Sequence, residues 1–235
     1  MFFQKFALIL LGAIGLQVSY AQKTPPEMCA TGVHAILIRG QGDGDHLNVL
    51  VTMQNLVLQL IPGSTSVGLP YHHERDDHRV VAADGVLLMQ QYIREYVASC
   101  PKSKIFLLGY SLGGIVVMDG LCGTSSLWLI PVPAIEPSYN RNVIAAASYG
   151  EETFMPKMPW DAGTCTDGVG LYPRIHPEWC DPFRESLRSY CDQGDVVCCL
   201  KYPPQIDGSH FFYIFRYNLD LLHFVQRRLN ETGPL

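Results

Sequence analysis

The sequence has 235 residues, with 17 Lys and Arg against 22 Asp and Glu, and 48% of its residues are hydrophobic. This length and hydrophobic content predict a folded chain with a sizeable core and exclude a disordered one. The net charge of −5, without a cluster of Lys and Arg, argues against binding to nucleic acid.

The first 21 residues are typical of a secretory signal peptide. Lys5 supplies the positive start, and the apolar run at 6–16 is too short to span a bilayer comfortably. The small-x-small sequence that ends at Ala21 predicts cleavage there, which leaves a mature domain of residues 22–235. We therefore expect an extracellular protein. No later segment is long and apolar enough for a membrane span, so we expect no stable membrane anchor.

The apolar pattern alternates between strand-like runs and helix-like periodicity. In chain order it predicts a strand at 33–38, a loop at 41–45, helices at 47–60 and 80–97, a strand at 104–108, and helices at 115–121, 184–190 and 219–229. A further apolar run lies at 127–132, and 149–181 is rich in Gly, Pro and aromatic residues. This alternation predicts a single α/β domain whose helices cover a mostly parallel central sheet.

Eight cysteines follow the predicted cleavage site, and an even number in a secreted chain predicts disulfides. They are Cys29, Cys100, Cys122, Cys165, Cys180, Cys191, Cys198 and Cys199. Their spacing matches no common zinc site, and it leaves the pairing open. Asn230, in an Asn-Glu-Thr sequon, is a candidate glycosylation site.

Ser111 lies in the motif Gly109-Tyr-Ser-Leu-Gly113, between a predicted strand and a predicted helix. A G-x-S-x-G turn in this setting is sharp, and it exposes the serine hydroxyl near the N-terminus of a helix. The alternative is a structural glycine-rich turn. The position of the motif between strand and helix favours a catalytic nucleophile.

A serine nucleophile needs a histidine base, which in this kind of fold follows the acid in the chain. His210 follows a loop with Pro and Gly and precedes the last predicted helix. His176 precedes the attractive acids. His223 lies inside the last helix, where we expect a partly buried packing residue. We therefore predict that His210 is the base.

The carboxylate that orients the histidine should lie a little upstream of it. Asp192, Asp195 and Asp207 are the candidates. Asp195 is favoured because a disulfide closing the short segment 191–198 would hold its carboxylate in place. The alternative is an ordinary aspartate in a turn.

These segments resemble the cutinase and acetylxylan esterase family of small secreted α/β hydrolases. The resemblance is carried by 100–114 with 119–123, by 191–198 and by 210–213. It implies a lidless three-layer α/β-hydrolase sandwich that needs no cofactor and no metal. It also implies that Ser111 is the nucleophile, Asp195 the acid and His210 the base.

In the same family two donors stabilise the oxyanion of the transition state, and losing one typically costs about 3 kcal/mol. The resemblance implies the backbone N–H of Leu112 and a donor at Gln41. The family usually has Gln in place of Leu112, and Ser or Thr in place of Gln41. Neither difference removes the triad.

Gly163-Thr-Cys165, Cys180 and the adjacent Cys198-Cys199 resemble acetylxylan esterase more than cutinase. The implied disulfides are Cys29–Cys100, Cys122–Cys180, Cys165–Cys199 and Cys191–Cys198. This resemblance implies a monomeric esterase that acts on short-chain esters, with a plant cell-wall polysaccharide such as xylan as substrate. The apolar rim at 200–206 would instead suit the longer acyl chains of a cutinase or lipase-like esterase, so both substrate classes stay open.

Two further interpretations belong to other classes. A non-catalytic binding protein on a hydrolase scaffold would usually lack a triad residue, and all three are present here. The loop that contains His72, His73, Asp76, Asp77 and His78 has residue types that bind zinc. It lacks the spacing of a helical zinc motif, and we expect a solvated polar loop.

Overall fold

The computed structural model of the chain describes residues 29–43, 47–71, 77–201 and 208–233. The predicted signal peptide, Asp207 and most of the apolar rim at 200–206 lie outside the described residues. Within the described ranges, no helix combines the length and the apolar character that a membrane crossing requires.

Six strands form one sheet in the order β2-β1-β3-β4-β6-β5, and every neighbouring pair is parallel. The strands are β1 (Val33–Ile38), β2 (Thr65–Gly68), β3 (Lys104–Tyr110), β4 (Val143–Tyr149), β5 (Asp161–Ala162) and β6 (Leu187–Tyr190). Because the strands are parallel, their carboxyl ends meet at one edge of the sheet. In open sheets of this kind, that edge is where binding sites form.

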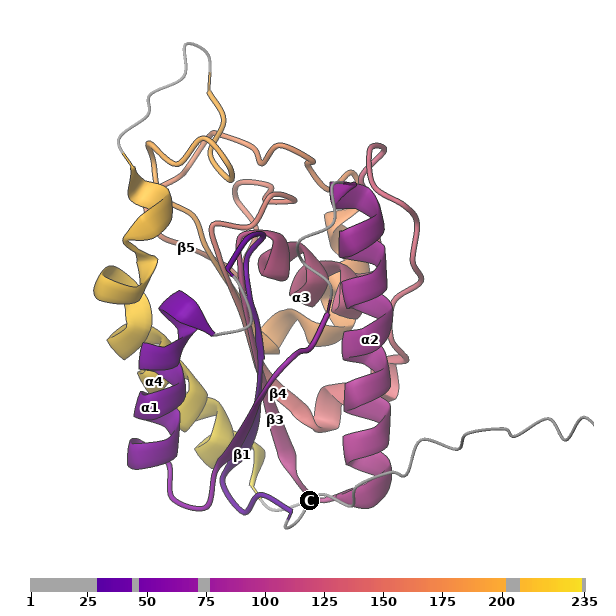
Figure 1. The fold of residues 1–235 in the computed structure, drawn as a ribbon, viewed down its shortest axis with the longest axis vertical. Coiled ribbons are helices and arrows are strands. Elements are labelled where there is room, and N and C mark those ends of the chain that lie inside the picture. Colours follow the sequence, from indigo (N-terminus) through magenta and orange to yellow (C-terminus); the bar gives the residue numbers. More distant parts are fainter. Residues whose placement is uncertain (1–28, 44–46, 72–76, 202–207, 234–235) are drawn as a thin grey trace, which may run out of the picture.

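Helices cover both faces of this sheet. Helices α1 (Val51–Leu60) and α4 (Tyr213–Thr232) lie on one face, and α2 (His78–Ser99) and α3 (Leu112–Cys122) lie on the other (Figure 1). The 3-10 helices are η1 (Asn48–Leu50), η2 (Pro137–Arg141), η3 (Pro177–Ser186) and η4 (Ser209–Phe211). This arrangement confirms the predicted three-layer α/β fold.

Alternate residues of the central strand β3 pack on opposite faces of the sheet. Ile105 and Leu107 belong to the core beneath α2 and α3, whereas Phe106 and Leu108 belong to the core beneath α1 and α4. All four are fully buried. A strand buried on both faces has a continuous apolar run, and this run made β3 the clearest strand in the sequence.

Several predicted elements differ from the observed ones. Residues 184–190 are not a helix, because η3 ends at Ser186 and β6 begins at the next residue. The apolar run 127–132 forms neither helix nor strand, and Pro131 removes a backbone donor that a strand would need. Strand β4 was not predicted, since its centre is a run of alanines with low strand preference.

Four disulfides connect the described elements, and they are the pairs that the family resemblance implied: Cys29–Cys100, Cys122–Cys180, Cys165–Cys199 and Cys191–Cys198. No free cysteine remains among the described residues. Cys191–Cys198 closes the segment that follows β6 at the carboxyl edge of the sheet, and Cys165–Cys199 joins that segment to the one after β5. They restrain the irregular chain on this edge, where the candidate site lies.

Candidate active site

Ser111 occupies a strained turn between β3 and α3. Its backbone has φ 53° and ψ −120°, a conformation that residues other than glycine rarely adopt. A side chain at Gly109 would lie 2.0 Å from the Gly113 carbonyl oxygen, so only glycine fits there. The Ser111 N–H donates to the Tyr149 carbonyl at 2.9 Å, which fixes the turn against the end of β4. This is the geometry that the G-x-S-x-G motif predicts.

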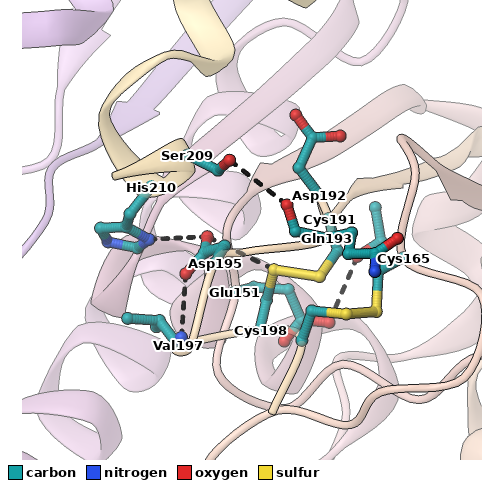
Figure 2. Close-up of a disulfide and its surroundings, with 12 residues drawn as sticks. Glu151, Cys165, Cys191, Asp192, Gln193, Asp195, Val197, Cys198, Ser209 and His210 are labelled. Atoms are coloured by element: carbon teal, nitrogen blue, oxygen red, sulfur yellow. Dashed lines mark hydrogen bonds and ion pairs between the residues drawn. A yellow bond between two sulfur atoms is a disulfide. The ribbon is translucent and has the colours of Figure 1, made fainter. Parts of the chain in front are cut away.

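Asp195 and His210 form a hydrogen-bonded pair beside this turn. His210 Nδ1 lies 2.8 Å from Asp195 Oδ2, with the carboxylate fully buried and the imidazole 15% exposed (Figure 2). A carboxylate only accepts hydrogen bonds, so Nδ1 carries the proton and Nε2 of the neutral ring is free to accept one. This tautomer is the one that a general base requires.

The loop that carries Asp195 is held at several points. The Cys191–Cys198 disulfide closes it, and the Val197 N–H donates to Asp195 Oδ1 at 2.8 Å (Figure 2). The Ser209 hydroxyl, next to His210, donates to the carbonyl of Gln193 within the same loop at 3.3 Å. The acid and the base are therefore fixed relative to one another by backbone contacts as well as by their own hydrogen bond.

Gly150, directly after β4, makes room for the pair. A Cβ on this residue would lie 2.8 Å from His210 Nδ1 and 2.9 Å from Asp195 Oδ2, and the backbone φ is +59°. On the other side, the Tyr110 ring lies 5.1 Å from the His210 ring, measured between centroids. Tyr110 directly precedes Ser111, so the ring of the predicted base lies against the neighbour of the predicted nucleophile.

The two predicted oxyanion donors lie on neighbouring segments. Leu112 is the buried first residue of α3. A Cβ on Gly113 would lie 2.1 Å from the Ile38 carbonyl oxygen and 2.5 Å from that of Arg39, so the start of α3 packs directly against the end of β1. Gln41 follows on the loop after β1.

The side chain of Gln41 is exposed and faces α2. Its Oε1 lies 2.9 Å from Nδ1 of His78, and Nε2 of the same histidine lies 2.8 Å from Glu152 Oε2. These contacts join the loops after β1 and β4 through the first residue of α2. His78 therefore has protein partners on both ring nitrogens and does not belong to a solvated loop.

Asp192, the second candidate acid, has hydrogen-bond partners other than a histidine. The buried carboxylate of Asp192 accepts hydrogen bonds from Thr164, Arg216 and Tyr217, and none of these is a histidine. Its role is to anchor the start of α4 to the loop that carries Asp195. Asp207, the third candidate, lies outside the described residues.

The other two histidines lie away from the site. His176 is paired with Glu178 and stacked on the Trp179 ring. His223 is exposed on α4, so its predicted role in packing is wrong. The helix itself was predicted, and His223 lies within it, on its exposed face.

The described part of the chain contains one group of metal-ligating side chains that lie close together, Cys165, Cys191 and Cys199. All three sulfurs are in disulfides and have no thiolate to offer a metal. Asp77, from the histidine-rich loop, accepts a hydrogen bond from the Arg79 N–H and caps α2. His72, His73 and Asp76 of that loop lie outside the described residues.

Glu151 is a buried acid at the site that the sequence did not single out. Burial raises the pKa of its carboxyl from 4.5 to about 7. Its Oε2 accepts from the Thr153 N–H at 2.7 Å, and the Ser189 hydroxyl lies 3.4 Å from its Oε1. A Cβ on Gly114 would lie 2.5 Å from the Glu151 Cβ, so this acid supports the first turn of α3 behind Ser111.

Replacing Gly150 with Ala should separate the acid from the base. We expect activity to fall on the order of 100-fold, since a shift of about 1 Å in a catalytic group can cost that much. Gly233→Ala is the matched control, because its φ of +58° is also positive, but its Cβ would lie in open space at the end of α4. Both variants should lose about 1 kcal/mol of stability from the positive φ, and Gly150→Ala should lose more, because its Cβ also meets buried side chains. Equal activity in the two variants would show that Gly150 provides no necessary space.

The raised pKa of Glu151 predicts a decrease in stability with pH. Between about pH 4.5 and 7 the folded state keeps a proton that the unfolded state releases, so the free energy of unfolding falls as pH rises through this window. Glu151→Gln cannot titrate, and we expect it to remove up to about 3 kcal/mol of that fall. Urea unfolding at pH 5 and pH 8 measures this change in the free energy of unfolding. The variant Glu185→Gln, at an exposed residue, is the control for the loss of one charge. A fall as large in Glu151→Gln as in the wild type would contradict this assignment.

Comparisons with known proteins agree with this arrangement. The acetylxylan esterase 2 of Talaromyces purpureogenus is 28% identical over 192 residues, which are 76% of this chain and 78% of that protein. Cutinase 11 of Verticillium dahliae is 28% identical over 193 residues, 77% of this chain but only 63% of that protein. A solved acetylxylan esterase structure superposes with a TM-score of 0.77 at 26% identity and covers 86% of this chain and all of its own.

The Cutinase family model matches residues 29–229, which is nearly all of the described chain. The match includes the turn at Ser111, the loop at Asp195 and the segment at His210. The resemblance that the sequence suggested is therefore confirmed, and the chain belongs to the cutinase family.

Proposed function

We propose that this protein is a secreted serine esterase that hydrolyses short-chain carboxylic esters through an acyl-enzyme on Ser111. The observation that carries this proposal is the buried Asp195–His210 hydrogen bond, which lies beside the strained turn of Ser111 at the carboxyl edge of the sheet. A nucleophile, a base and an orienting acid in this chain order are the parts that acyl transfer requires.

In the acylation step, Ser111 Oγ attacks the ester carbonyl carbon while His210 Nε2 takes the hydroxyl proton. Asp195 stabilises the imidazolium that forms and does not itself take the proton. The N–H of Leu112 and a donor of Gln41 bind the oxyanion of the tetrahedral intermediate. His210 then returns the proton to the leaving alcohol as the bond between the acyl carbon and the alcohol oxygen breaks.

In the deacylation step, the same base takes a proton from water, and the resulting hydroxide attacks the acyl carbon. The intermediate collapses to release the acid, and Ser111 Oγ recovers its proton from His210. The cycle uses no cofactor and no metal, because the imidazole moves every proton.

A short acyl group is the favoured substrate, with acetylated xylan or a related plant cell-wall polysaccharide as its natural source. The four disulfides are the pairs that the resemblance to acetylxylan esterase implied, and relatives named acetylxylan esterase align with most of the chain. The second candidate is a longer acyl ester, as in a cutinase. Phe211 and Phe212, which directly follow the proposed base, are 65% and 47% exposed and could contact an acyl chain.

An extracellular location fits the cysteines. Four disulfides with no free thiol among the described residues need an oxidising compartment. The predicted signal peptide at 1–21 and the sequon at Asn230 favour the same route. Esters of cell-wall polymers would meet the enzyme only outside the cell.

Hydrolysis of p-nitrophenyl esters from acetate to palmitate, with acetylated xylan and a cutin polyester in parallel, tests this proposal. We expect kcat/KM to be greatest between acetate and butyrate and to fall with longer chains, and we expect release of acetate from xylan. Ser111→Ala should abolish turnover in every assay, because the covalent intermediate cannot form.

Three outcomes would contradict parts of the proposal. Full activity in Ser111→Ala would exclude the serine mechanism. A kcat/KM that rises through octanoate, as about 0.8 kcal/mol per buried CH₂ would produce, together with no release of acetate, would favour the longer acyl substrate. No hydrolysis of any ester by the wild type would favour a non-catalytic binding protein.

A further inference from the structure

The buried carboxylate of Asp195 has a third hydrogen-bond donor besides His210 and the backbone. The Tyr213 hydroxyl lies 2.7 Å from Asp195 Oδ2, the same oxygen that receives the His210 Nδ1 proton. The other oxygen, Oδ1, receives the Val197 N–H at 2.8 Å. The side chain of Asp195 is fully buried, so these protein groups replace the water that a carboxylate normally binds.

The direction of the Tyr213 hydrogen bond is set by its surroundings. The backbone N–H of Asp192 donates to the Tyr213 oxygen at 3.0 Å, so the hydroxyl proton is left for the carboxylate of Asp195. Burial, followed by the negative charge of Asp195, raises the pKa of the Tyr213 hydroxyl far above its ordinary value. The hydroxyl therefore stays protonated, and can donate, at neutral and moderately alkaline pH.

The ring of Tyr213 cannot move away from this position. It is buried at the start of α4 and lies parallel to the Tyr149 ring, with centroids 5.8 Å apart and planes 9° apart. A Cβ on Gly150 would lie 2.9 Å from the Tyr213 ring as well as close to the acid and the base. Tyr213, three residues after the base His210, thus places its hydroxyl donor against Asp195.

We propose that Tyr213 is a positioning residue of the active site, whose hydroxyl holds the carboxylate of Asp195 turned so that Oδ2 receives the His210 proton. This inference rests on the proposed triad. Two donors on Oδ2 and one on Oδ1 fix the plane of the carboxylate. Hydrogen bonds to the charged form favour that form, and donors to a charged group are stronger than neutral ones.

Tyr213→Phe removes only the hydroxyl, and Tyr190→Phe is a matched control. Tyr190 is equally buried, its ring contacts the same Tyr149 at 5.4 Å, and its hydroxyl donates to a carboxylate outside the site, Asp220, at 2.7 Å. We expect kcat to fall roughly tenfold or more in Tyr213→Phe with little change in KM, which is the usual range for a bond to a charged group. We expect Tyr190→Phe to keep the kcat of the wild type.

The pH profile separates this role from a purely structural one. A buried carboxylate that has lost a donor holds a proton more readily, and a protonated Asp195 can no longer stabilise the imidazolium of His210. The acid limb of the kcat profile should therefore move to higher pH in Tyr213→Phe and stay in place in Tyr190→Phe. Wild-type kcat and an unmoved acid limb in Tyr213→Phe would overturn the proposal.

Proton NMR tests the contact without relying on turnover. In the wild type we expect a low-field resonance for the His210 Nδ1 proton, with a nuclear Overhauser effect to a slowly exchanging hydroxyl proton of Tyr213. That hydroxyl signal should vanish in Tyr213→Phe. If the wild type showed no such hydroxyl signal of Tyr213, the proposal would be overturned even if the variant failed to fold. If no ester were hydrolysed, the same spectra would still decide the role of Tyr213, so failure of the esterase proposal is distinguishable.

Discussion

The carboxylate of Asp195 has no contact with water, and a buried charge of this kind is stable only where donors surround it. Its donors come from three places: the base, the backbone two residues later and the start of the last helix. Each of them must be brought to the acid by the fold. Much of the irregular structure at this edge of the sheet holds the carboxylate of Asp195 and its donors in place.

The parallel sheet supplies the remaining constraint. Because all strands point the same way, the segments after β1, β3, β4 and β6 emerge together at one edge. These segments carry Gln41, Ser111, Gly150 and Asp195 in that order. Residues more than 150 positions apart in the sequence therefore need only short loops to meet. The Cys191–Cys198 and Cys165–Cys199 disulfides restrain the segment after β6, which carries Asp195 and whose described residues contain no long helix or strand.

The site could be read from the sequence where a local pattern encodes it. The turn at Ser111 needs glycines at fixed offsets, and the loop at Asp195 is bracketed by cysteines, so both were predicted. Gly150 and Tyr213 were missed because their importance comes from contacts between distant segments. For Gly150, the local signal in the sequence was its position directly after the apolar run that ends at Tyr149.

The elements of the fold also differ in how well the sequence predicts them. Strongly apolar runs such as β3 were recognised, whereas β4, with alanines at its centre, was not. Residues 184–190 were predicted as one short helix, whereas the structure divides them between the end of the 3-10 helix η3 and the strand β6. Strand β6 has no β-branched residue, and β4 has them only at its start, at Val143 and Ile144. Their state is decided by the neighbours with which they pair, and a single sequence does not display these neighbours.

A crystal structure of the protein after reaction with a short-chain p-nitrophenyl phosphonate would test the proposed chemistry most directly. We predict phosphorus bonded to Ser111 Oγ and a phosphoryl oxygen that accepts the Leu112 N–H. His210 Nε2 should face the modified oxygen while Nδ1 remains on Asp195. Phosphorus on another residue, an unmodified Ser111, or a His210 that has left Asp195 would contradict the account.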